Sequence, residues 1–295
     1  MGERVFKTLD QQIEILRSRG LIIKDEDYDS AKQFLLKNNY YRISGYSLTL
    51  RNHDKFYENI SITDVMDIYF FDHELRHILL KYLEFIETLI KSLFAYEFSR
   101  LYGGLGHLNS ANFNDISEYL RILAKVKEQR DKSLSDEAYI QHYVKDLQEE
   151  MPLWVYVELL SFSDISKLYS ISKPELQSII ADHCGFTVPQ KVDILKEYLY
   201  GMTILRNFCA HGRRLYNRLF VRKPTLNSRE KKLLNKDEKG VIDNSHLFGF
   251  ILELKRILPK DAFDEMKVSI ISLTNKYPSV QMRHYGFCDD WQNKI

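Results

Sequence analysis

Glycine and proline are scarce in this sequence, with 12 and 6 among 295 residues. Tight turns depend on these two residue types, so their scarcity argues against a fold of many short strands and for long helices. The chain also has little net charge, +1 in formal terms. Such a chain has no overall attraction for nucleic acid, and any nucleic-acid contact has to come from a local basic patch.

Cysteine is rare as well, and Cys184, Cys209 and Cys288 are widely spaced. This odd, scattered set argues against a disulfide framework or a zinc site and is typical of a reducing compartment. We expect no metal and no cofactor. The first residues, MGERVFKTLD, lack the apolar segment of a signal peptide, and no apolar run is long enough to span a bilayer. We therefore expect a cytoplasmic protein that makes no membrane contact.

Apolar residues recur at helical spacing along most of the chain, and no convincing strand alternation appears. We therefore expect an all-α fold. The longest helical pattern covers residues 62–102 and ends before Gly103. Its apolar stripe consists of Leu79, Leu83, Ile86, Ile90 and Leu93. This spacing predicts one long helix at the centre of the core.

The remaining chain divides around that helix. Residues 1–60 read as an N-terminal helical extension whose two helices are followed by a tyrosine-rich break at 38–46. Residues 61–295 form the main helical domain, with a second core helix at about 190–217 and further helices at the C-terminus. The polar, basic segment at about 222–244 predicts a mobile loop. A buried helix begins at Pro152, with Trp154 and Phe162 expected on its core face.

The segment LRNFCAHGRRLYNR, residues 205–218, carries the most specific chemistry. Asn207 and His211 are four residues apart and so share one helix face, while Arg206 lies beside it. Arginine can bind a phosphate oxygen, and histidine can transfer a proton near neutral pH. RNA supplies its own nucleophile, the 2′-hydroxyl. The three residues are therefore candidate catalytic groups for RNA cleavage, and Asn207 would hold the imidazole or the substrate.

A basic run follows the motif and predicts a local phosphate-binding patch. Its candidate RNA-binding residues are Arg213, Arg214, Arg218 and Arg222. A looser pair, Arg100 and His107, lies on either side of glycines that break the helix. We do not interpret this second pair as a site.

Several of these residues also have structural interpretations. Arg206 and His211 could form a surface ion pair or interact with the helix dipole. The tyrosines of the 38–46 segment could stack on single-stranded bases, but we expect them to fix the N-terminal helices to the core. Cys209 is expected to be a small buried residue, and Tyr216 to be a packing residue.

Six ordered blocks strengthen the catalytic interpretation, among them NNYYRISGY, FDHELRHILLKYLEFIETLIK and the closing GFCDDW. Together with LRNFCAHGRRLYNR they resemble the Abi-like (AbiD/AbiF-type) abortive-infection proteins of the HEPN superfamily. The resemblance implies a HEPN-type four-helix core and defence against phage. It also implies a homodimer whose two motifs form one metal-independent ribonuclease site that leaves a 2′,3′-cyclic phosphate. An acidic residue from a neighbouring helix often braces this motif, and Glu84 and Glu87 are the candidates.

Two other functions remain open. The chain could hold a structured regulatory RNA without cutting it, or use its dimer face as a protein-interaction scaffold. A toxin of this kind could also have an RNA or protein antitoxin as a partner. The titratable His211 favours an enzyme, because binding alone needs only cations.

Overall fold

The computed structural model describes residues 5–236 and 240–295. Within these ranges the chain is helical, and its single sheet is a two-stranded antiparallel hairpin, so the all-α prediction is confirmed. The α-helices are α1 (Leu9–Ser18), α2 (Tyr28–Asn38), α3 (Tyr40–Tyr46), α4 (Ile62–Tyr102), α5 (Ile116–Ser133), α6 (Ala138–Gln141), α7 (Leu153–Tyr156), α8 (Phe162–Ile171), α9 (Pro174–His183), α10 (Lys191–Ala210), α11 (Ser228–Lys231), α12 (Leu247–Ile257), α13 (Lys260–Lys276) and α14 (Trp291–Lys294). The hairpin pairs β1 (Arg51–Asn52) with β2 (Lys55–Phe56). Short 3₁₀ turns lie at Asp25–Asp27, Gly106–Leu108, Ser110–Asn112, Val157–Leu159 and Met282–Tyr285, and a π-helical segment at His142–Leu147.

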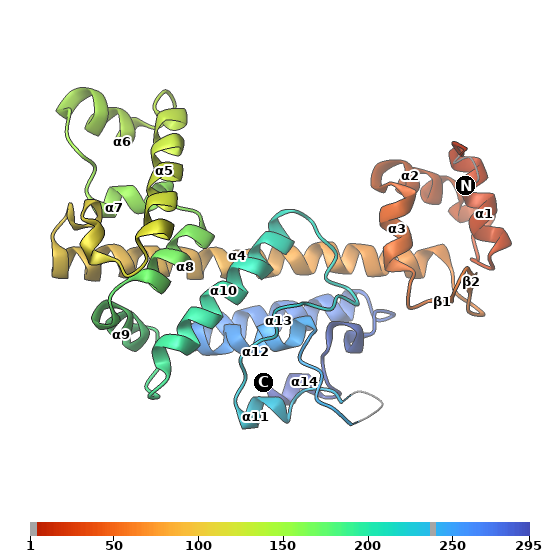
Figure 1. Cartoon of the computed structure of the whole chain (residues 1–295). Coiled ribbons are helices and arrows are strands. Elements are labelled where there is room, and N and C mark those ends of the chain that lie inside the picture. The colour runs from red at the N-terminus through yellow and green to blue at the C-terminus, as the bar shows by residue number, and fades with distance from the viewer. Residues whose placement is uncertain (1–4, 237–239) are drawn as a thin grey trace.

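Helix α4 is a rod of 41 residues that runs through the whole molecule (Figure 1). It begins at a capping box, in which Ser61 N–H donates to the Asp64 carboxylate at 2.8 Å and Asp64 N–H to the Ser61 hydroxyl at 3.3 Å. It ends at Gly103, whose φ of 80° continues no right-handed helix. The predicted helix at 62–102 is therefore confirmed.

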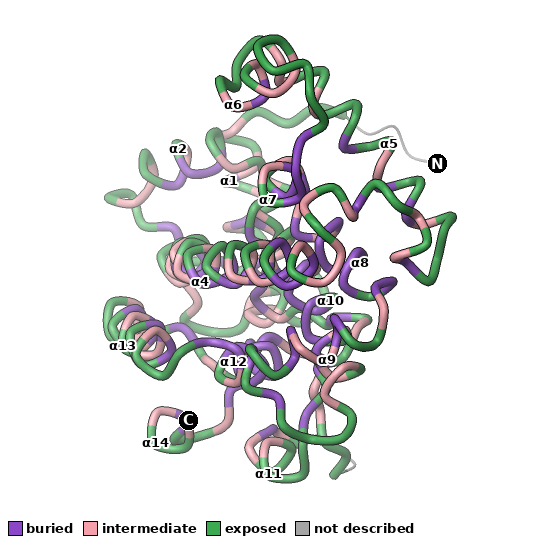
Figure 2. Tube along the Cα trace, turned by 90° about the vertical axis from the view of Figure 1, so that its left-hand side faces the viewer, coloured by how far each residue is buried: buried purple, intermediate pink, exposed green. Residues whose placement is uncertain are grey.

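The core surrounds α4, which Figure 2 shows end-on among its neighbours. Helices α10 and α13 pack along it, and α8 and α9 cover its C-terminal half. Of the predicted stripe, Leu79, Leu83, Ile86 and Ile90 are fully buried, whereas Leu93 is partly buried. Helix α4 thus forms the centre of the core, and α12 packs on α10 and α13 outside it.

The N-terminal extension packs on the first turns of α4 through aromatic edges. The rings of Phe34 and Tyr46 each lie 5.2 Å from the ring of Tyr69. The predicted break at 38–46 is wrong, because this segment forms helix α3. The interruption is confined to Asn39, which takes a φ of 61° and accepts the Tyr41 N–H at 2.9 Å. Asparagine tolerates this left-handed region better than most residues do.

Two further predictions are wrong beyond α4. The single helix expected from Pro152 is divided into α7, a 3₁₀ turn and α8, because Ser161 forms a new capping box with Asp164. Phe162 is buried as expected, but Trp154 is 54% exposed.

No described helix is apolar enough over sufficient length to cross a membrane.

The segment expected to be a mobile loop at 222–244 contains α11 and is anchored to the core. Leu226 and Leu234 are buried, and Glu230 pairs with Arg256 of α12 at 2.6 Å. The predicted loop also includes residues 237–239, which lie outside the described residues.

Candidate nucleic-acid interface

Helix α10 presents the Arg–Asn–His motif at its C-terminal end. Its inner face is fully buried, which fixes the helix on α4. The helix ends at Ala210 rather than at 217, because Gly212 takes a φ of 59°. His211 caps the helix, and its N–H donates to the Asn207 carbonyl at 3.1 Å. Asn207 and His211 are therefore still one turn apart, with both side chains exposed.

Arg206 turns toward α4 and meets one of the two acidic candidates. Its Nε lies 3.6 Å from Oε2 of Glu87, whose side chain is only 13% exposed. The same carboxylate pairs with Lys91 at 3.2 Å. Glu84 is exposed and has no ion pair among the described residues. The structure thus brings Glu87 to the motif and leaves Glu84 apart from it.

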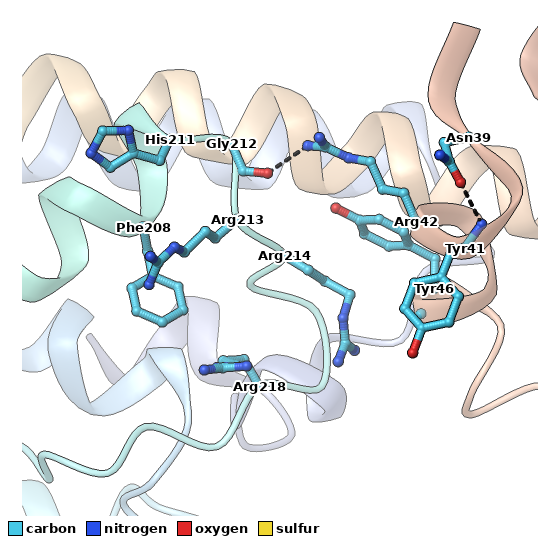
Figure 3. Close-up of a pocket in the computed structure, with 11 residues that line it drawn as sticks. Asn39, Tyr41, Arg42, Tyr46, Phe208, His211, Gly212, Arg213, Arg214 and Arg218 are labelled. Atoms are coloured by element: carbon cyan, nitrogen blue, oxygen red, sulfur yellow. Dashed lines mark hydrogen bonds between the residues drawn. The ribbon is translucent and has the colours of Figure 1, made fainter. Parts of the chain in front are cut away.

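His211 lines a hollow of about 780 Å³ between α3 and the loop that follows α10 (Figure 3). Arg206 and Asn207 lie outside its lining. The hollow is formed by Asn39, Tyr41, Arg42, Gly45, Tyr46, Phe208, His211, Gly212, Arg213, Arg214 and Arg218. Its two walls are joined by Arg42, which donates to the Gly212 carbonyl at 2.5 Å.

The charged side chains of this hollow are all of one sign. The guanidinium carbons of Arg213 and Arg218 lie 5.2 and 5.0 Å from the ring centre of Phe208, one cation–π contact each. Arg214 donates to the Tyr216 carbonyl at 2.6 Å. None of these three arginines has a carboxylate partner in the described parts of the chain. Their charge is therefore available to an external anion.

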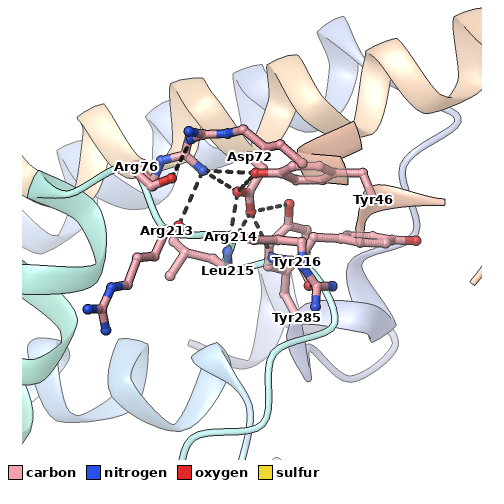
Figure 4. Close-up of polar contacts among 10 residues, drawn as sticks. Tyr46, Asp72, Arg76, Arg213, Arg214, Leu215, Tyr216 and Tyr285 are labelled. Atoms are coloured by element: carbon pink, nitrogen blue, oxygen red, sulfur yellow. Dashed lines mark hydrogen bonds and ion pairs between the residues drawn. The ribbon is translucent and has the colours of Figure 1, made fainter. Parts of the chain in front are cut away.

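A buried polar network holds the loop after His211 in place (Figure 4). At its centre is Asp72 of α4, which is fully buried. Its carboxylate accepts the Tyr216 N–H at 2.8 Å, the Leu215 N–H at 3.2 Å, the Tyr46 hydroxyl at 2.8 Å, the Tyr285 hydroxyl at 3.0 Å and a short contact from Arg76. Four segments that are distant in sequence therefore share one carboxylate.

The Asp72 network was not predicted from the sequence, although a signal for it exists. Asp72 and Arg76 are spaced i, i+4 in line with the buried Leu75 and Leu79. Two opposite charges placed on the buried face of a helix indicate a paired interior group.

The region from α2 to the end of the loop at 211–217, called the motif loop below, corresponds to one known family. The Abi-like protein family model matches residues 33–217, well over half of the chain. The chain belongs to this family. Membership suggests a role in abortive infection, a form of defence against phage. Comparison with curated proteins and with solved structures gave no match.

One predicted RNA-binding residue of this Abi-like protein serves the core instead. The side chain of Arg222 is 8% exposed, and its Nη1 bonds both oxygens of Glu253 at 2.8 Å. Burial raises the pKa of the Glu253 carboxyl to about 7. Arg222 balances this buried acid and is not accessible to RNA, so the prediction for Arg222 is wrong.

The cysteines of the Abi-like protein offer no reactive thiolate near the motif. Cys209 is buried, and burial raises the pKa of its thiol to about 12, which keeps it protonated at neutral pH. Its expected role as a small buried residue is confirmed. Within residues 5–236 and 240–295 no cluster of three or more histidine, cysteine, aspartate or glutamate side chains could hold a metal ion.

Proposed function

We propose that this Abi-like protein is a metal-independent endoribonuclease of the HEPN type that acts in phage defence. Two chains would pair with their motifs facing each other. The observation that carries the proposal is the position of His211, an exposed histidine beside Arg213 and Arg218, which have no acidic partner among the described residues. A proton-transfer group next to uncompensated positive charge suits a phosphodiester substrate.

Arg206 would stabilise the negative charge that develops on the phosphate. Its contact with Glu87 at 3.6 Å uses one side of the guanidinium and limits its rotation. The remaining N–H groups can bind a non-bridging phosphate oxygen. A pre-oriented donor of this kind contributes more in the transition state than one that has to be ordered during the reaction.

His211 would transfer the protons of the reaction. The 2′-oxygen attacks phosphorus and loses its proton to a base, while the bond to the 5′-oxygen breaks and that oxygen gains a proton. The products are a 2′,3′-cyclic phosphate and a 5′-hydroxyl. Two His211 side chains, one from each protomer, could supply the base and the acid. Asn207, exposed one turn earlier, would orient the imidazole or the substrate.

The test is cleavage of end-labelled RNA in EDTA, with analysis of the product ends. We expect the wild type to produce cyclic-phosphate ends, and His211→Ala and Arg206→Ala each to lose at least about 100-fold in rate. His142→Ala and Arg130→Ala are matched controls, because neither residue lines the hollow and their side chains are 56% and 29% exposed. Circular dichroism and sedimentation check folding and dimer formation in each variant.

The outcomes separate the enzyme from the two other functions. Equal cleavage by wild type and His211→Ala would exclude this mechanism. If neither cuts and both bind RNA tightly, the chain is an RNA-binding module. If RNA affinity is absent at low salt, the interaction scaffold is favoured, because a phosphate-binding site has a salt-dependent affinity.

A further inference from the structure

The hollow beside His211 has a wall that the proposed chemistry does not use. Helix α3 of the N-terminal extension contributes Tyr41 and Arg42, which lie opposite the motif loop in Figure 3. These residues are about 170 positions away from Gly212 in sequence, yet Arg42 bonds its carbonyl. The extension is therefore part of the site as well as an attachment to α4.

Tyr41 has the exposure of a binding residue rather than of a packing residue. It is 86% exposed, whereas Tyr46 on the same helix is 1% exposed and bonded to Asp72. Its backbone N–H is held by the Asn39 side chain at 2.9 Å, which fixes the point from which the ring projects. An aromatic ring on a rigid support beside cationic groups suits the face of a base.

The hollow gathers several arginines that lack an acidic partner in the described chain. Buried arginines elsewhere have one, as Arg76 has Asp72 and Arg222 has Glu253, while the exposed Arg229 and Arg283 lack one there as well. Arg42, like the arginines of the opposite wall, has none among the described residues. The hollow lies within the roughly 300–1,000 Å³ of ligand pockets in general.

We propose that Tyr41 and Arg42 form a nucleotide subsite for the strand that is cut. Tyr41 stacks on the base of a nucleotide next to the scissile phosphate, and Arg42 with Arg213 binds the phosphate of that nucleotide. A base can reach Tyr41 only when it is unpaired, so the subsite selects single-stranded RNA. This inference rests on RNA being the substrate proposed above.

The bond from Arg42 to the Gly212 carbonyl links this subsite to the motif. Gly212 follows His211 directly, so the guanidinium that binds the neighbouring phosphate also fixes the backbone beside the imidazole. A Cβ at Gly212 would lie 3.2 Å from Nη2 of Arg42, and the φ of +59° disfavours any side chain there. The contact therefore depends on glycine at this position.

The test measures the dissociation constant of a labelled single-stranded oligoribonucleotide in the His211→Ala protein, where cleavage does not interfere. We expect Tyr41→Ala to weaken binding roughly 5- to 150-fold, which corresponds to about 1–3 kcal/mol. Tyr41→Phe keeps the ring and should bind as the parent protein does. Tyr57→Ala, which also removes an exposed tyrosine of the extension, is the matched control and should have no effect. A fully paired duplex should bind Tyr41→Ala and its parent equally.

The possible failures are distinguishable. If the wild type cleaves RNA and Tyr41→Ala binds the oligonucleotide as tightly as its parent, the subsite is wrong and the proposed ribonuclease stands. If Tyr41→Ala loses duplex and single-stranded RNA alike, selection by stacking is wrong. If the wild type neither binds nor cuts RNA, both proposals fail together.

Discussion

Single residues of this chain take their roles from burial as much as from sequence spacing. His107 follows Arg100 in a pattern similar to that of His211 and Arg206, yet it is 3% exposed and packs 4.7 Å from the ring of Tyr156. Burial lowers the pKa of its imidazole to about 4. A histidine that stays neutral and has no access to solvent cannot serve as an acid–base group for RNA.

His107 gives a prediction for the pH dependence of stability. Its pKa is about 4 in the folded chain and about 6.5 when unfolded, so the unfolded state binds more protons between these values. The free energy of unfolding should therefore fall as pH falls from 6.5 to 4, by about 3 kcal/mol from this residue. His107→Phe should lose this part of the slope, measured by urea unfolding at several pH values.

A matched control for this measurement is His142→Gln, since the side chain of His142 is 56% exposed. It should keep the slope of the wild type. Part of the slope remains in His107→Phe as well, because partial burial also lowers the pKa of His284 to about 4. A His107→Phe protein with an unchanged slope would contradict the role of burial assigned here.

Helix α10 depends on a close approach that glycine allows. A Cβ at Gly201 would lie 2.7 Å from Cζ of Arg222 and 3.1 Å from Oε2 of Glu253. Gly201→Ala should destabilise the protein by about 1–3 kcal/mol in chemical unfolding, although alanine is the better helix former. Gly45→Ala in α3 is the control: its Cβ would lie 3.5 Å from Arg214, an ordinary contact, and stability should stay the same or rise. Equal effects would show that the Arg222–Glu253 pair does not limit the space beside α10.

Helices could be predicted well from the sequence where the buried apolar residues recur at the spacing of one helix face. Helix α4 was predicted at about 62–102, as it is observed, because residues such as Leu79, Leu83 and Ile86 repeat at helical spacing and glycines follow the last turn. Helix α3 was missed because some of its tyrosines are buried and others are exposed, so its apolar residues do not mark one helix face. Arg222 was misjudged because its partner Glu253 is 31 residues away, a distance that no local pattern covers.

At the scale of the whole molecule, Asp72 makes the extension and the motif loop parts of one cooperative unit. Tyr46→Phe removes one donor to this carboxylate and should cost about 1–2 kcal/mol. We expect hydrogen exchange to become faster in α3 and also at residues 213–217, while α9 stays protected. Tyr169→Phe, which removes a buried bond to the Gln177 carbonyl at 3.0 Å, should instead affect α8 and α9.

Faster exchange confined to α3 in Tyr46→Phe would contradict this coupling.

The motif itself was found from the sequence, since its residues are adjacent along the chain. The network that fixes the loop after His211 joins positions near 46, 72, 215 and 285, and only the folded chain brings these together. The family match ends at residue 217, so Tyr285 lies beyond it.

The uncompensated arginines of the hollow have a practical consequence at the bench. A cationic hollow of this size attracts whatever small anions a buffer provides, and phosphate or sulfate would occupy it in place of the RNA backbone. Each arginine that gives up such an ion on binding RNA adds to the salt dependence of the affinity. We therefore expect the proposed RNA cleavage to be weaker in phosphate buffer than in dilute Tris chloride.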